Sequence, residues 1–336
     1  TTAIGQGALA NQNFTTATHT FNTAVGYDAG SAVTTGSQNT FVGGLAGQDV
    51  TTATENTFIG QRAGENYTTG DINTAVGSYA LNAIGGTGTG TVNAAFGKNA
   101  LLNNTSGSQN TALGTYTLSA NTTASYNTAV GYGAGIAVTT GTQNTFVGGL
   151  SGDGTDDGLR NTAVGYLALS ANADNDNTAI GVEALSVTTA ANSTAVGQKA
   201  GSALTSGSNC LFLGQNAGLT GNPGGNFTTQ SNALVIGNVS TSAAHVQVDW
   251  TVASDQRDKT DFTALDLGLD FVKALAPVTY RWDKRAKYGD ITADDYDLAA
   301  QSPDGTHKED WLDIGFKAQE VQALEEAAGY TTAAKK

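Results

Sequence analysis

The sequence of 336 residues contains one cysteine, no methionine, three prolines and only 13% charged residues. Because Cys210 is the only cysteine, a disulfide framework or a cysteine metal site within one chain is excluded. There is no run of 18 apolar residues, so no helix is predicted to span a bilayer. We expect no membrane insertion, no metal and no cofactor.

Positive charge is also scarce, and the formal net charge is −14. A protein that binds phosphates needs a positive surface, so neither nucleic acid nor an anionic membrane surface is an expected partner. Residues 254–336 hold eleven basic residues, whereas residues 1–253 hold only four: Arg62, Lys98, Arg160 and Lys199. This asymmetry predicts two parts, with a boundary near residue 250.

Glycine, in contrast, is abundant, with 44 residues. A five-residue unit, N-T-A-V-G with close variants, recurs along most of the chain, mostly at steps of 16 or 17 residues. Such a period predicts a stack of similar coils. The closing glycines, which end these units, are Gly5, Gly26, Gly43, Gly60, Gly77, Gly97, Gly114, Gly131, Gly148, Gly165, Gly181, Gly197, Gly214 and Gly237.

Each unit has the same internal order. An asparagine lies four residues before most closing glycines, an apolar residue directly before each, and a small residue three positions after, followed by Gly or Leu. This order predicts a short strand with Thr and Val on alternate sides, a glycine bend and a second short strand. Stacking would align the units into an apolar stripe and an asparagine ladder. The expected fold is mainly β, a parallel β-solenoid of about 14 coils over residues 1–240.

A coil of about 17 residues is thin, and its Val and Ile side chains have little to pack against within one chain. Three such rods around a common axis would bury them, so we expect a homotrimer. The repeats resemble the head repeats of trimeric autotransporter adhesins and, more closely, the repeats of bacteriophage tail fibres. The resemblance covers about residues 3–240.

The repeat pattern ends before residue 254, and the sequence that follows is of a different kind. Leu265, Leu269, Val272 and Leu275 are spaced for one face of a helix that Pro277 ends. Residues 278–282 alternate as a strand, residues 283–310 read as a long acidic loop, and residues 314–324 read as a strand and then a helix.

This order resembles the intramolecular chaperone auto-processing domain of phage tail spikes and fibres. The residues that carry the resemblance are Ser254, Asp255, Arg257, Lys259, Leu275, Pro277, Tyr280, Trp282, Gly315, Ala318, Gln319, Glu320 and Val321. The resemblance implies a small α+β domain over residues 254–336 after a connector at 241–253. It implies that this domain helps three chains assemble and then cuts itself off. The chain starts inside a repeat unit and stops before the long trimeric helix common in these domains, so we expect it to be part of a longer protein.

The resemblance assigns self-cleavage to Ser254 and Lys259, with Asp255 and Arg257 in support, at the Ala253–Ser254 bond. A serine hydroxyl becomes a nucleophile when a base takes its proton. Lys259 can serve if its pKa is lowered by desolvation or by positive charge such as that of Arg257. The expected activity is at most a single turnover, with none on other substrates.

Two functions follow from these expectations. The first is a phage tail fibre in the virion, with itself, other tail proteins and a host receptor as partners, a glycan among the receptor candidates. The alternative is an adhesin-like fibre on a bacterial surface with the same chaperone. A polysaccharide-cutting enzyme needs paired carboxylates, and the repeats show no such pattern. Among smaller features, we expect residues 153–158 to form a solvated turn, residues 85–90 to bulge outward, Cys210 to be buried, and most tyrosines to pack between coils or chains.

Overall fold

The computed structural model describes residues 1–13, 20–219, 225–242, 268–283, 302–308 and 310–327. The chain divides into two compact units, Thr1–Thr241 and Ser242–Lys336. The described residues of the first unit contain fourteen strands, and those of the second contain two helices and two strands.

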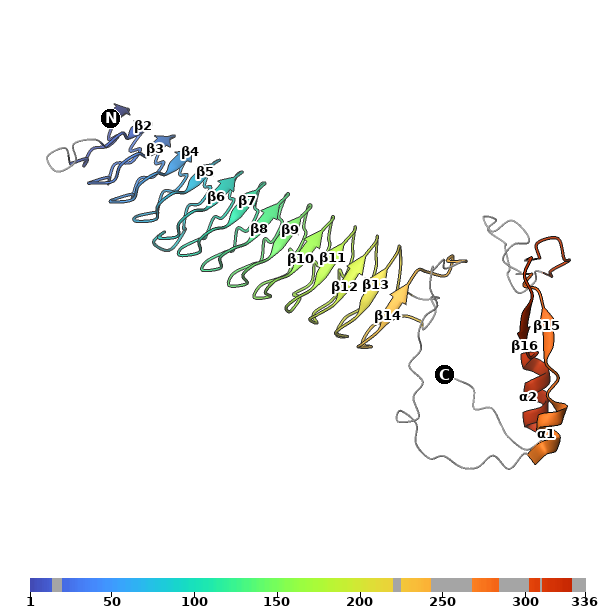
Figure 1. Ribbon diagram of the computed structural model, residues 1–336. Helices are drawn as coiled ribbons and strands as arrows, with labels where there is room; N and C mark the ends of the chain where they lie inside the picture. Colours follow the sequence, from blue (N-terminus) through green and yellow to red (C-terminus); the bar gives the residue numbers. More distant parts are fainter. Residues whose placement is uncertain (14–19, 220–224, 243–267, 284–301, 309, 328–336) are drawn as a thin grey trace. The chain divides into compact units, whose positions relative to one another are not determined.

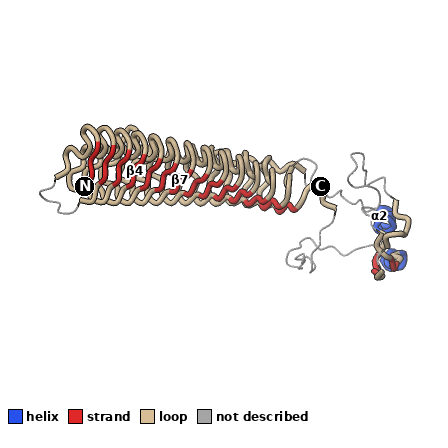
Figure 2. The backbone as a smooth tube through the Cα atoms, turned by 90° about the horizontal axis from the view of Figure 1, so that it is seen from above, coloured by secondary structure: helices blue, strands red, loops and turns tan. Residues whose placement is uncertain are grey.

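The first unit is a parallel β-solenoid in which successive coils each add one strand to a single sheet (Figure 1). Equivalent residues of neighbouring coils stand opposite one another, as Ala24 stands opposite Phe41. The strands form one row along the shaft, and turns form its other sides (Figure 2). The predicted mainly β solenoid is confirmed. The strands are β1 Thr2–Ile4, β2 Thr23–Val25, β3 Thr40–Val42, β4 Thr57–Ile59, β5 Thr74–Val76, β6 Ala94–Phe96, β7 Thr111–Leu113, β8 Thr128–Val130, β9 Thr145–Val147, β10 Thr162–Val164, β11 Thr178–Ile180, β12 Thr194–Val196, β13 Leu211–Leu213 and β14 Leu234–Ile236.

Each strand ends at a closing glycine with a backbone conformation that side chains rarely adopt. The φ angle is 136° at Gly43 and 134° at Gly60. A Cβ atom at Gly43 would lie 2.5 Å from the carbonyl oxygen of Gly60 in the next coil. The same approach, at 2.4–2.6 Å, recurs at every closing glycine from Gly5 to Gly197. Glycine is therefore required at this position both by φ and by the stacking of the coils.

The side-chain directions within the strands differ from the prediction. The middle residue of each strand from β2 to β14, such as Ala24 or Phe41, is buried, whereas the first and third residues face outward. Thr and Val were predicted on alternate sides, and this was wrong, because residues two apart lie on the same face of a strand. The prediction of a second short strand in each coil was also wrong. The described coils have turns there, linked to their neighbours by bonds such as Gly30 N donating to Ala46 O at 2.9 Å.

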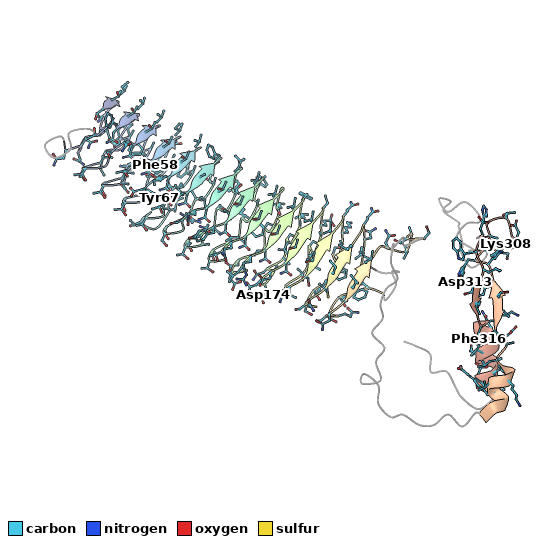
Figure 3. The ribbon with its side chains drawn as sticks, in the orientation of Figure 1. Phe58, Tyr67, Asp174, Lys308, Asp313 and Phe316 are labelled. Atoms are coloured by element: carbon cyan, nitrogen blue, oxygen red, sulfur yellow. The ribbon has the colours of Figure 1, made fainter. Side chains whose placement is uncertain are left out.

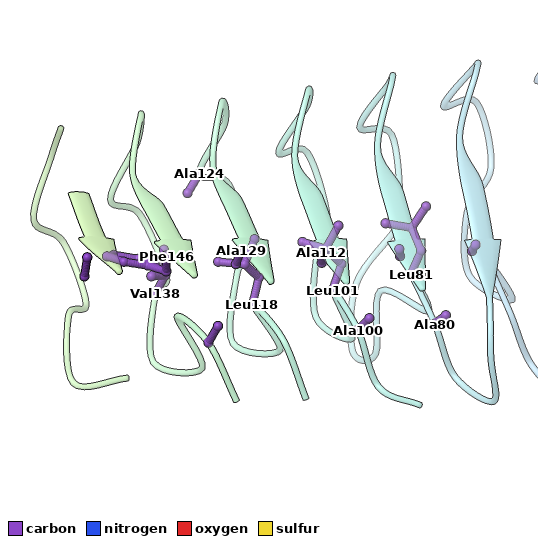
Figure 4. Packing of buried hydrophobic residues seen from close by; sticks show 14 of the residues in the cluster. Ala80, Leu81, Ala100, Leu101, Ala112, Leu118, Ala124, Ala129, Val138 and Phe146 are labelled. Atoms are coloured by element: carbon purple, nitrogen blue, oxygen red, sulfur yellow. The ribbon is translucent and has the colours of Figure 1, made fainter. Parts of the chain in front are cut away.

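The interior is filled by a size match between two positions: the strand centre and the residue four after the closing glycine, which we call the core position. The core position is Gly wherever the strand centre of its own or the next coil is Phe. A Cβ at Gly152 would lie 2.4 Å from the Phe146 ring, and one at Gly135 would lie 2.9 Å from it. Where both strand centres are Ala, the core position is a buried leucine, namely Leu9, Leu81, Leu101, Leu118, Leu169 or Leu185. Figure 4 shows three of these leucines: Leu81, Leu101 and Leu118.

The predicted asparagine ladder runs inside the shaft, and its side chains are hydrogen-bonded there, except that Asn161 Nδ2 has no partner. The backbone N–H of Asn127 donates to Oδ1 of Asn110 at 3.0 Å, and Asn110 Nδ2 donates to the carbonyl of Ala124 at 2.8 Å. The Oδ1 links extend from Asn22 to Asn177 and on to the backbone N–H of Ser193. The ladder thus serves as a structural element of the stack.

We predict that Asn110→Ala lowers the free energy of unfolding by about 2–4 kcal/mol, because it leaves the buried N–H of Asn127 without an acceptor and removes one of the two side-chain donors to the carbonyl of Ala124. Asn110→Ser is expected to cost less. A later coil of the chain has Ser193 at the ladder position, and its Oγ accepts a hydrogen bond from Cys210 N at 3.3 Å. Chemical unfolding of the wild type, Asn110→Ala and Asn110→Ser measures the order of their free energies of unfolding. An equal loss for both variants would contradict the role of the side-chain acceptor.

The long coil between Gly77 and Gly97 contains the predicted bulge. Residues 84–87 are exposed as predicted, but Gly88 and Gly90 are buried. The ring of Tyr67 lies over Gly88, where a Cβ would approach it to 2.2 Å, and packs edge-on to Phe58 (Figure 3). Its hydroxyl accepts a hydrogen bond from Asn104 Nδ2 at 2.6 Å, and burial raises the Tyr67 pKa far above its ordinary value. The insertion makes room for this internal tyrosine.

The second unit contains α1 (Gly268–Ala274), β15 (Val278–Tyr280), β16 (Asp313–Gly315) and α2 (Ala318–Ala327). β15 and β16 pair antiparallel, with Thr279 opposite Ile314. The predicted helix before Pro277, the strand after it and the later strand and helix are confirmed, each shorter than or shifted from its predicted range.

Candidate functional site

The predicted cleavage residues lie outside the described part of the chain. Ala253, Ser254, Asp255, Arg257 and Lys259 all fall between residues 243 and 267. Their roles therefore stay predictions, as does the connector at 241–253. After residue 242, the described part of the second unit resumes at α1, nine residues after Lys259.

The hairpin of β15 and β16 brings together several residues that carry the resemblance. The Tyr280 ring lies beside Gly315, where a Cβ would be 3.2 Å from Cε1. Tyr280 also packs edge-on against Trp282, with ring centroids 5.3 Å apart. Asp283 Oδ2 accepts a hydrogen bond from the backbone N–H of Gly305 at 2.8 Å, which anchors residues 302–308 to the end of the hairpin. The hairpin is thus built on an aromatic pair over a glycine.

Apolar side chains of this unit are largely exposed. None of its side chains that the structure describes, from residue 271 to 327 with gaps, is buried. Ile314 is 80% exposed, Leu312 60% and Trp311 58%, and Phe316 follows at the end of β16 (Figure 3). An exposed apolar surface of this kind is typical of a surface that binds another molecule.

The shaft also carries an exposed apolar surface. The residue before each closing glycine forms an outer row along the sheet, and the row is apolar in all fourteen strands. Its members are half-buried or exposed, reaching 52% at Ile236 and 60% at Ile4. This agrees with the prediction that the apolar stripe has little to pack against within one chain.

Carboxylates of the shaft are engaged in local contacts. Arg62 Nη1 donates to Oε1 of Glu65 at 2.9 Å, and Asn82 Nδ2 donates to Oε2 at 3.1 Å. Burial, and secondarily the charge of Glu65, raises the pKa of Asp49. Within the predicted turn at 153–158, Asp156 and Asp157 are exposed, but Asp153 is partly buried and its pKa is raised by desolvation. The turn is therefore only partly solvated.

Other predicted features can be placed as well. Cys210 is buried, as predicted, and faces the carbonyl of Gln230 at 3.3 Å. Among the described residues, no group of three or more His, Cys, Asp and Glu side chains is arranged to hold a metal ion. The described helices are all too short or too polar to cross a bilayer.

The tyrosines divide into two groups. Tyr67 is buried and Tyr79 lies under the guanidinium of Arg62, 5.7 Å from the ring centroid, which fits the predicted packing between coils. Others are more than half exposed: Tyr27, Tyr126, Tyr132 and Tyr166. Sequence reasoning missed that several of these lie on one corner of the shaft. The signal was present, because Tyr132 and Tyr166 both directly follow closing glycines.

Comparison with known proteins gave one match. Residues 254–330 match the family described as the chaperone of endosialidase, which is also named as a peptidase family. No curated protein and no solved structure matched the chain. The match begins at Ser254, the residue predicted to follow the cleaved bond, and it ends just beyond α2. The chain therefore carries a β-solenoid followed, at its C-terminal end, by a chaperone-of-endosialidase domain.

Proposed function

We propose that the chain is a fibre protein of a phage tail, that it forms a homotrimer, and that its shaft serves in attachment to the host surface. The observation that carries this proposal is a chaperone-of-endosialidase match directly after a fourteen-stranded solenoid in the sequence. A long rod of repeated coils provides reach, and a chaperone at its end provides assembly.

The exposed apolar surfaces support the homotrimer. The outer row leaves Val, Ile and Leu side chains on one side of the sheet along its whole length, and three copies around an axis would remove them from water. Trimer formation would also remove exposed apolar side chains of the second unit, such as Ile314 and Leu312, from water. Repeated coils can also pair between chains one coil out of register, which a chaperone at one end would prevent.

The second part of the proposal is self-cleavage. Lys259 accepts the hydroxyl proton of Ser254 as Oγ adds to the carbonyl carbon of Ala253. It then returns this proton to the nitrogen as the C–N bond breaks, which leaves an ester and the free amine of Ser254. Water then hydrolyses the ester, which gives the carboxylate of Ala253 and restores the serine hydroxyl. Each chain performs this reaction once, after assembly.

Cleavage is tested by producing the full chain and its variants and measuring fragment masses. We expect the wild-type chain to yield fragments 1–253 and 254–336, and Ser254→Ala and Lys259→Ala to stay intact. Ser302→Ala, which alters a described exposed serine of the same unit, is the control and should cleave normally. Cleavage that persists in Ser254→Ala would exclude the proposed nucleophile.

A further inference from the structure

A surface strip of aromatic and aliphatic side chains runs across four successive coils of the shaft. It lies on the corner that follows the closing glycines, apart from the outer row of the sheet. Neighbouring coils are joined there by backbone hydrogen bonds, as where Leu150 N donates to Tyr132 O at 2.9 Å. The aromatic strip consists of Tyr116, Tyr132, Leu150 and Tyr166.

Side chains in the strip lean over the preceding coil. The ring of Tyr132 meets Tyr116 edge-on, with centroids 6.1 Å apart. Leu150 covers Gly133, where a Cβ would lie 2.9 Å from Cδ2, and Tyr166 lies beside Gly149 at 3.5 Å. Gly149 thus lies in the coil between those of Tyr132 and Tyr166, which are 59% and 51% exposed.

The chemistry of this corner is neutral. In the four coils, the first and second residues after each closing glycine are Thr, Tyr, Gly or Leu, without a charge. A tyrosine ring offers an apolar face with a hydroxyl at its edge, which suits a ligand that is apolar on one face and polar around its rim. The net charge of −14 disfavours a polyanion through long-range repulsion.

From this geometry we propose that the aromatic strip binds a neutral glycan, with sugar rings stacked on Tyr132 and Tyr166 and with Gly149 as the floor between them. The inference rests on the proposed attachment function and names its ligand class and site. Two coil steps separate these rings, about 9.6 Å along the shaft. A glycan chain lying along the shaft contacts both, and three copies of the strip in a trimer would raise the avidity.

A second copy of the chain is a less suitable occupant. Packing between rods is served by the outer row, which is apolar in every strand, whereas the strip covers four coils only. Its exposed groups are the tyrosines Tyr132 and Tyr166, which carry hydroxyls, and do not form a continuous aliphatic surface like the outer row.

The test is binding of the full chain to an array of neutral and acidic oligosaccharides, after light scattering has established its oligomeric state. We expect binding to neutral glycans, weakened about tenfold or more by Tyr132→Ala with Tyr166→Ala. Tyr126→Ala is the matched control, because Tyr126 is also 59% exposed but lies elsewhere on the coil, before the ladder asparagine. It should bind as the wild type does.

A second variant blocks the floor without removing a ring. Gly149 has an ordinary φ, and only Tyr166 lies near its Cβ position, so Gly149→Gln is expected to fold and to abolish binding. Gly44→Gln, at the equivalent place of another coil with nothing within 4 Å, should keep it. A trimer that binds no neutral glycan, or variants that bind unchanged, would overturn the site alone. Loss of the trimer in the tyrosine variant would assign the strip to the subunit interface instead. A wild-type chain that forms no trimer contradicts the proposed function itself.

Discussion

Gly43→Ala is expected to destabilise the shaft by at least about 3 kcal/mol, with the damage centred on β3 and β4. An alanine there must adopt a φ near 136°, a conformation that costs about 1–3 kcal/mol for a residue with a Cβ. The added carbon would also meet the carbonyl oxygen of Gly60 at 2.5 Å, which forces the two coils apart. In a solenoid, each coil contacts only its neighbours, so separation at one step is not compensated elsewhere.

Hydrogen exchange with mass spectrometry, together with thermal unfolding, measures this effect coil by coil. The matched control is Gly44→Ala, which changes the next residue. Gly44 has no left-handed φ and nothing within 4 Å of its Cβ position. The free energy of unfolding of Gly44→Ala should therefore stay within about 0.5 kcal/mol of that of the wild type. If Gly43→Ala and Gly44→Ala behave alike, the stacked glycines do not determine the coil geometry.

Phe146→Ala is expected to cost about 3–5 kcal/mol, because it leaves a cavity between two coils whose core positions are glycines. Gly152→Leu alone is also expected to destabilise, since a Cβ there lies 2.4 Å from the Phe146 ring. Combined, the two changes reproduce the Ala and Leu arrangement of other coils, in which Leu169 and Leu185 adopt φ values of 55° and 47°.

We therefore expect Phe146→Ala with Gly152→Leu to recover a substantial part of the stability that Phe146→Ala loses. The wild type, the two single variants and the double variant form a double-mutant cycle. Denaturant unfolding of these four chains gives the coupling energy between the two positions. A coupling energy near zero would mean that the alternation of Phe with Gly and Ala with Leu is not a size match.

The sequence was sufficient to predict the solenoid and the asparagine ladder, because each depends on residues that repeat at one spacing. The direction of the strand side chains could have been predicted from the alternation of three residues, but Thr and Val were predicted on alternate sides of the strand. In fact Ala24 is buried and Val25 faces outward. The interior is narrow, so alanine and glycine fill most of it.

Other features required coordinates. The size match between Phe146 and Gly152 joins positions that are six residues apart in sequence but face each other only once the coil closes. Tyr67 reaches Asn104 across 37 residues, past an insertion that the sequence presented as an external bulge. The predicted cleavage pair, Ser254 and Lys259, came from resemblance to a family, and the family match at residues 254–330 supports the domain but not the roles of these residues.

We propose that the chain is one subunit of a trimeric fibre and that its C-terminal domain assembles the trimer. Native mass spectrometry of the full chain and of Ser254→Ala tests this most directly. We predict three copies in both preparations, with fragment 254–336 separated from the shaft only in the wild type. A monomer of 34.0 kDa in both preparations would contradict the account, because the outer row of the shaft and the apolar side chains of the second unit would then have no partner.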